Sequence, residues 1–211
     1  MFDIVKPTEI EKRSFEIITE LLGDRKLDPE NEPVIKRVIH TTADFEYADN
    51  LVFSPGAVTK GIEALKAGCH IVTDTSMVMS GINKTILGKL GGQVHCFIAD
   101  PDVADGAKAR GITRSAVSME KAAKLDKPCI FAVGNAPTAL IALHELMEAG
   151  KVKPALIIGV PVGFVNVVEA KELTMEMDCP WIVARGRKGG SNVAAAICNA
   201  LLYTASRNER E

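Results

Sequence analysis

Short aliphatic runs alternate with longer amphipathic segments along most of the chain. Six runs are rich in Val, Ile, Phe or Ala, and each is followed by a helix-like stretch: residues 50–53, 70–73, 94–99, 129–133, 155–159 and 181–184. Short apolar runs of this kind are typical of buried strands. Strands that alternate with helices favour a parallel sheet, because parallel neighbours need a crossover connection. The pattern therefore predicts a three-layer, doubly wound α/β fold, with a mainly parallel sheet and helices on both faces.

Two helices are predicted ahead of the first strand. Thr8 and Glu11 have the spacing of a capping box, and Gly23 follows the apolar periodicity, so the first helix is expected over about residues 9–22. The second is expected over about residues 33–40.

Length and charge limit the class of protein. A chain of 211 residues fits a single domain, which we divide into N-terminal helices (1–45), an α/β core (46–206) and a frayed tail (207–211). The formal net charge of -2 argues against an extended nucleic-acid surface, which needs an excess of Lys and Arg. No apolar run approaches the roughly 20 residues that cross a bilayer, and the first residues lack the pattern of a secretion signal. We therefore expect a cytoplasmic protein that binds neither nucleic acid nor membrane.

Cysteine and histidine are too dispersed for an evident metal site. The five cysteines include no CxxC pair and are expected to be reduced, buried thiols: Cys69, Cys96, Cys129, Cys179 and Cys198. We therefore predict no zinc site.

The loops that follow the predicted strands hold most of the candidate chemistry. In open parallel sheets, ligands bind beyond the carboxyl ends of the strands. Several of these loops combine Gly or Pro with Ser, Thr or Asn before a helix, where free N–H groups favour an anion, although the same residues are common in turns and caps: 54–56, 74–77, 100–102, 134–138, 159–164 and 185–191. The last loop adds Arg185, Arg187 and Lys188, which suit a carboxylate or phosphate group or form a solvated basic turn.

Most signatures of well-known enzyme classes are missing. The chain has no GxGxxG, GxxxxGK[ST], HExxH or GxSxG motif, and the glycines of residues 88–92 follow a helical pattern and predict its end. A nucleotide-dependent oxidoreductase is therefore the weaker alternative for this fold.

The four histidines differ in their surroundings. His70 and His95 lie in apolar runs and are predicted to be packed and hydrogen-bonded, whereas His144 is predicted on a helix surface. His40 lies at the end of the second predicted helix, close to the acids Asp44 and Glu46. A helix carboxyl end stabilises an imidazolium, so His40 is either a proton donor or a residue that only satisfies helix carbonyl groups. The residues alone favour the second interpretation.

Residues 37–47, continuing through 51–57, resemble the signature of the precorrin-8X methylmutases of cobalamin biosynthesis. Similar segments follow in the order in which that family has them: 74–78, 111–115, 134–140 and 159–165. The resemblance covers nearly the whole chain.

This resemblance implies an isomerase that moves a methyl group from C-11 to C-12 of precorrin-8X or cobalt-precorrin-8 by a 1,5-sigmatropic shift, giving hydrogenobyrinate or cobyrinate. It further implies a homodimer that holds no metal or nucleotide of its own. The position that matches the family's proton-donating histidine is His40. Ser14 and Arg114 fall in segments like those with which the family holds the tetrapyrrole.

A modified tetrapyrrole is apolar across its face and ringed by carboxylates, so its site needs apolar walls and separated anion anchors. The predicted substrate-binding residues are Ser14, Thr75, Met77, Arg114, Asn135, Gly163, Phe164, Arg187 and Lys188. Phe53, Met79 and Val162 are further candidates for the walls. Asp44 and Glu46 either orient the imidazole or are exposed acids at a helix end. A non-catalytic tetrapyrrole carrier is the second alternative function.

Overall fold

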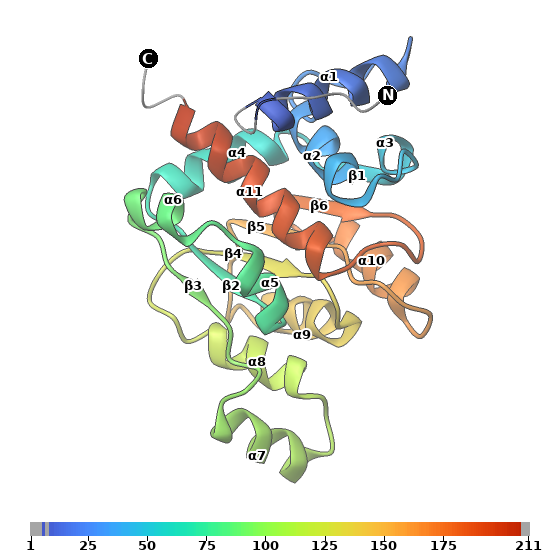
Figure 1. Cartoon of the computed structure of the whole chain (residues 1–211). Coiled ribbons are helices and arrows are strands. Elements are labelled where there is room, and N and C mark those ends of the chain that lie inside the picture. Colours follow the sequence, from blue (N-terminus) through green and yellow to red (C-terminus); the bar gives the residue numbers. More distant parts are fainter. Residues whose placement is uncertain (1–5, 7–8, 208–211) are drawn as a thin grey trace.

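A computed structural model describes Lys6 and residues 9–207. Within these residues, six strands form one sheet in the order β1-β6-β5-β4-β2-β3 (Figure 1). All neighbouring strands are parallel except β1 and β6, which are antiparallel. The predicted mainly parallel sheet is confirmed. The strands are β1 (Leu51–Phe53), β2 (His70–Thr73), β3 (Val94–His95), β4 (Cys129–Val133), β5 (Leu156–Gly159) and β6 (Trp181–Ala184).

Five strands lie within one residue of the predicted ranges. The exception is β3, for which residues 94–99 were predicted but only Val94 and His95 are paired. β3 is an edge strand and bonds only to β2, through the pairs Ile71–Val94 and Val72–His95. At the edge of the sheet β3 has hydrogen bonds to one neighbour only, and the apolar run of residues 94–99 leaves the sheet after His95.

Helices connect and cover the strands. Their bounds are α1 (Ile10–Leu22), α2 (Glu32–Thr42), α3 (Tyr47–Asn50), α4 (Ala57–Lys66), α5 (Ser76–Gly81), α6 (Lys84–Lys89), α7 (Pro101–Arg110), α8 (Arg114–Ala122), α9 (Pro137–Glu148), α10 (Val167–Met175) and α11 (Ser191–Arg207). None of them, within the part of the chain that the structure describes, is long and apolar enough to cross a membrane.

The two predicted N-terminal helices are confirmed as α1 and α2. Thr8 of the predicted capping box lies outside the described residues, and Glu9 at the start of α1 makes no side-chain cap. The predicted end of a helix within residues 88–92 is also confirmed, since α6 ends at Lys89 and Gly91 has a φ of 83°. Arg207, where the frayed tail was predicted to begin, is the last residue of α11, and residues 208–211 lie outside the described residues.

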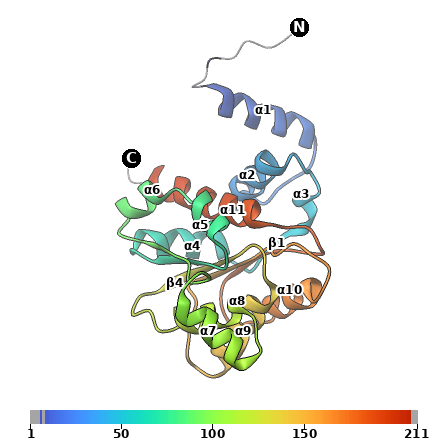
Figure 2. The same ribbon diagram turned by 60° about the horizontal axis from the view of Figure 1, so that its bottom comes forward.

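The sheet is covered on both faces, as predicted. Side chains of a strand alternate between faces, so Ile130 and Ala132 of β4 pack on one side with α4, α5 and α11, whereas Phe131 and Val133 pack on the other with α8 and α9. Figure 2 shows α4, α5 and α11 above the sheet and α7–α10 below it, with α2 and then α1 outside α11. The three-layer fold therefore carries an additional pair of helices on one side.

The direction of β1 decides which loops share an edge of the sheet. Because β1 is antiparallel to β6, its amino end lies at the carboxyl edge of the other strands, where the Arg185 N–H donates to the Asn50 carbonyl at 2.8 Å. Ser54 lies at the opposite edge, where its hydroxyl accepts from the Trp181 N–H at 2.9 Å. The prediction that residues 54–56 lie on the ligand edge is therefore wrong. Phe53 packs against the core beside that opposite edge, so its prediction as a wall is also wrong.

Candidate functional site

We call one region of the molecule the rim: the carboxyl edge of β2, β4, β5 and β6, with the loops that follow these strands. Hydrogen bonds join its loops. The Thr75 hydroxyl lies 3.1 Å from that of Ser191, at the start of α11. The Gly163 N–H donates to the Arg187 carbonyl at 3.2 Å, and the Gly190 N–H donates to a carbonyl of the β5–α10 loop at 2.9 Å. Three predicted site residues, Thr75, Gly163 and Arg187, therefore lie in adjoining loops.

Asp74 lies at the rim between β2 and β4. The strand order reverses at this point, and sheets of this class usually bind ligands there. Its buried carboxylate accepts hydrogen bonds from the N–H groups of Gly134, Asn135 and Ala136 at 3.0, 2.8 and 2.8 Å. Burial raises the pKa of Asp74, although these three bonds act to lower it. The amides ahead of α9 thus already have an internal acceptor, and the expectation that they are free for a ligand is wrong. The predicted contact of Asn135 can come only from its exposed side chain.

The basic loop after β6 is attached to the segment that follows α2. Lys188 Nζ lies 2.6 Å from Asp44 Oδ2 and 3.0 Å from Glu46 Oε2. These contacts raise the pKa of Lys188 and lower that of Asp44. The acids therefore balance the charge of Lys188, and within the described residues no hydrogen bond joins them to His40. Arg187 is exposed, and its side chain makes no hydrogen bond or ion pair in the same part of the chain.

A buried lysine holds this loop from beneath. Lys171 of α10 is fully buried, and its Nζ donates to the carbonyls of Gly186 and Lys188, each at 2.8 Å. Burial lowers the pKa of Lys171 to about 8. Sequence reasoning missed this residue. The available signal was its spacing, because Lys171 follows Val167 and precedes Thr174 on the buried face of α10.

His40 lies in the last turn of α2, as predicted, and its side chain is exposed. The imidazole stacks on Phe15 of α1, with ring centroids 5.4 Å apart and an interplanar angle of 12°. The Arg37 guanidinium lies 4.8 Å from the centroid of the Phe15 ring and 5.0 Å from that of Tyr203. His40 thus belongs to a stack that connects α1, α2 and α11. Ser14 is the neighbour of Phe15 along α1, and its hydroxyl donates to a carbonyl of its own helix.

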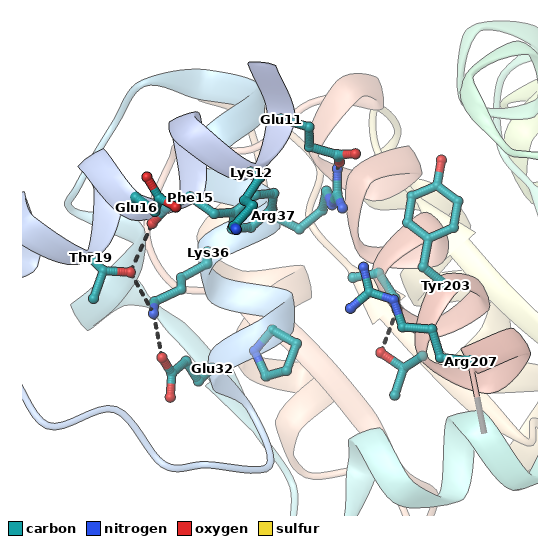
Figure 3. Close-up of a pocket in the computed structure, with 13 residues that line it drawn as sticks. Glu11, Lys12, Phe15, Glu16, Thr19, Glu32, Lys36, Arg37, Tyr203 and Arg207 are labelled. Carbon is teal, nitrogen blue, oxygen red and sulfur yellow. Dashed lines mark hydrogen bonds and ion pairs between the residues drawn. The ribbon is translucent and has the colours of Figure 1, made fainter. Parts of the chain in front are cut away.

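A cavity of about 560 Å³ lies between α1, α2 and α11 (Figure 3). Phe15, Arg37 and Tyr203 line it, together with Lys36, which bonds to Thr19. None of the predicted site residues lines this cavity or the other main cavities of the described residues, of about 600, 310 and 110 Å³. In a single chain, the predicted site is an open surface.

Exposed apolar side chains lie at the rim. Phe164 is 85% exposed, Val165 77%, Met77 72% and Val162 48%. Three of these were predicted as walls, while Met79 is half-buried. Because large apolar side chains seldom gather on a surface without a partner, the rim has the character of a contact surface.

Arg114 lies apart from the other predicted residues. It is exposed at the start of α8, and Figures 1 and 2 place α8 at the opposite end of the molecule from α1 and α2. One chain therefore does not bring Arg114 together with Ser14 and His40.

His70, His95 and the cysteines have ordinary structural environments, and His144 is half-buried on α9. His70 Nδ1 lies 2.8 Å from His95 Nε2, which confirms the predicted hydrogen bonding of both, and burial lowers the pKa of each. Three cysteines are buried as predicted, whereas Cys96 and Cys179 are half-buried. Among the described residues, no group of three or more His, Cys, Asp or Glu is arranged to hold a metal ion.

Comparison with known proteins decides the family. The family model described as precorrin-8X methylmutase matches residues 9–204. The chain is 46% identical to a cobalt-precorrin-8 methylmutase of Priestia megaterium over 197 residues, which cover 93% of this chain and 88% of that protein. The chain belongs to the precorrin-8X methylmutase family.

Other members of the precorrin-8X methylmutase family agree in sequence and fold. A precorrin-8X methylmutase of Pseudomonas aeruginosa is 39% identical over 204 residues, covering 95% of this chain and 98% of that protein. The crystal structure of the precorrin-8X methylmutase from Thermus thermophilus matches with a TM-score of 0.86 and 42% identity, covering 95% of this chain and 98% of that one. The family resemblance seen in the sequence is confirmed. The roles of His40, Ser14 and Arg114 remain predictions.

Proposed function

We propose that this protein is a methylmutase that acts on precorrin-8X or cobalt-precorrin-8 and moves the methyl group from C-11 to C-12. The observation that carries this proposal is the family match over residues 9–204, together with 46% identity to a cobalt-precorrin-8 methylmutase over 93% of the chain. The reaction is an internal rearrangement, so the protein has to bind, orient and polarise one substrate. We place it in the cytoplasm.

His40 is the proposed proton donor to the ring-C region of the macrocycle. Its imidazole is exposed, and its stacking on Phe15 fixes the ring plane against α1. A proton placed on the ring-C region withdraws electron density from C-12, so that C-12 accepts the methyl group together with the electron pair of the broken C-11–methyl bond, and the proton returns to the imidazole after the shift. Proton transfer of this kind contributes typically about 10²- to 10⁴-fold to a rate. The remaining acceleration comes from holding the macrocycle in one conformation.

We further propose that the active form is a homodimer in which a second copy covers the exposed rim. Phe164, Val165 and Met77 are each more than 70% exposed, and Ile10, Ile17 and Leu21 expose apolar surface on one side of α1. The predicted site residues line none of the main cavities formed by the described residues, so a covering subunit would supply the missing wall. Light scattering of the purified protein should give the mass of two chains; a monomer that turns over substrate would contradict this proposal.

Turnover of supplied substrate tests the activity. The purified protein is mixed with precorrin-8X, or with cobalt-precorrin-8 in a parallel experiment, and the product is followed by its absorption spectrum. Wild type should convert at least one of the two. His40→Ala should still bind substrate but lose about 10²- to 10⁴-fold in kcat, whereas the control His144→Ala, on α9, should keep the wild-type rate.

The outcomes separate the alternatives. Conversion by His40→Ala at the wild-type rate would remove His40 from the mechanism. Tight binding without conversion by the wild type would favour a tetrapyrrole carrier, and absence of both would reject the proposed function.

A further inference from the structure

Lys171 is a buried cation without an acidic partner among the described residues. Its two partners are carbonyl oxygens of a single loop, those of Gly186 and Lys188. A buried ammonium loses its hydration, and an apolar residue of similar volume often gives a fold that is as stable or more so. Stability alone therefore does not explain a lysine at this position. Its geometry matches a different task, which is to fix the path of the loop.

The loop is fixed on its other side by close packing. A Cβ added to Gly189 would lie 2.2 Å from the Val160 carbonyl oxygen, and the Gly190 N–H donates to that same oxygen at 2.9 Å. The backbone of residues 186–190 is thus held between Lys171 and the β5–α10 loop. Arg187, which lies between the two carbonyls that Lys171 binds, leaves its side chain exposed.

Lys188 extends this constraint to the N-terminal helices. Its carbonyl accepts from Lys171, and its own ammonium contacts Asp44 and Glu46, which follow α2. A single buried group therefore supports both the exposed Arg187 and the turn that begins after the helix of His40.

We propose that Lys171 is a positioning residue for substrate binding, which holds the loop of residues 186–190 so that Arg187 meets a carboxylate of the macrocycle. This inference rests on the proposed function. Lys171 itself does not touch the substrate. It acts through the main chain, and its loss should weaken binding more than it slows the chemical step.

Amide hydrogen exchange shows whether Lys171 restrains the loop of residues 186–190, and it does not require turnover. Exchange followed by mass spectrometry compares the wild type with Lys171→Met, Lys171→Gln and the control Lys84→Met, which changes an exposed lysine of α6. In both Lys171 variants, peptides that cover residues 186–190 should exchange about tenfold faster, while those of β4 stay unchanged. Loop exchange equal to that of the control in every folded Lys171 variant would overturn the proposal.

Steady-state kinetics then measure the positioning. Each Lys171 variant should raise KM by about tenfold and change kcat by less than about threefold, because an interaction made equally in the ground and transition states is lost. Arg187→Ala should also raise KM. In the Arg187→Ala background, Lys171→Met should raise KM by less than a further factor of about three, since the two residues act through one contact.

Several results of these experiments would overturn the positioning role of Lys171 or its contact with the substrate. A fall in kcat at constant KM, or full additivity with Arg187→Ala, would overturn the positioning role. If Lys171→Met does not fold, Lys171→Gln supplies the same readings, and an unchanged KM in Arg187→Ala would overturn the proposal by itself. Absence of turnover in the wild type would reject the proposed function and the substrate contact with it, while exchange would still decide whether Lys171 holds the loop.

Discussion

Burial of Lys171 predicts an unusual dependence of stability on pH. In the folded protein, burial lowers the pKa of this lysine from 10.5 to about 8. In the unfolded chain the lysine regains its ordinary pKa, so between these two values the unfolded state binds more protons than the folded state. Stability therefore rises with pH across this window. Below it, lysine is charged in both states and the folded state bears the full cost of burying the charge.

The magnitude follows from the interval between the two pKa values. Over the whole interval the free energy of unfolding rises by about 3 kcal/mol, and about 1.3 kcal/mol of this rise falls between pH 7 and pH 9. Buried thiols act in the opposite direction: burial raises the pKa of Cys69 to about 12 and that of Cys129 to about 11, so both lower the stability as the pH rises. The contribution of Lys171 must therefore be measured as a difference from Lys171→Met, which retains these thiols but has no titrating group at this position.

Urea unfolding followed by circular dichroism provides the assay. Wild type, Lys171→Met and the control Lys84→Met are unfolded at pH 7 and pH 9. With an m-value of about 2 kcal/mol/M, the midpoint difference between wild type and Lys171→Met should move by about 0.6 M in favour of the wild type as the pH rises. The difference between wild type and Lys84→Met should stay constant. A constant difference for Lys171→Met, or one that moves against the wild type, would show that Lys171 is not a desolvated ammonium in the folded protein.

Two further predictions concern buried polar groups and use the same unfolding assay at neutral pH. Asp74→Asn turns an amide NH₂ toward backbone N–H groups that need an acceptor, so we expect a loss of about 1–3 kcal/mol, and wild-type stability would show that the three bonds contribute little. Ser118→Ala removes a buried hydroxyl that has no hydrogen-bond partner among the described residues, so we expect a gain of up to about 1 kcal/mol; a clear loss would mean that the hydroxyl is bonded in solution.

The secondary structure followed closely from local pattern. The runs that became β2, β4 and β6 were predicted with correct ends, because strands buried on both faces are continuous aliphatic segments bounded by turn residues. The end of α2 was predicted to within two residues, which placed His40 correctly in its last turn. These features depend on residues a few positions apart, and one sequence is sufficient for them.

The parts that could not be predicted depend on contacts between distant segments. Asp74 was recognised as a loop residue, but the N–H groups that donate to its carboxylate lie about 60 positions further along the chain, at Gly134 and Ala136. Similarly, periodicity does not show that Lys171 meets carbonyls 15 and 17 positions away. Strand direction is equally hidden, which is why the loop after β1 was assigned to the wrong edge.

The reversal of β1 decides which charged groups can meet. A strand of three residues spans about 10 Å, so a parallel β1 would carry Asp44 and Glu46 to the far edge of the sheet, out of reach of Lys188. Positions 44 and 188 are 144 residues apart in the chain and are neighbours only because this peripheral strand runs backwards. A variant with the same side chains but with β1 parallel to β6 would separate the helix of His40 from the basic loop of residues 185–191.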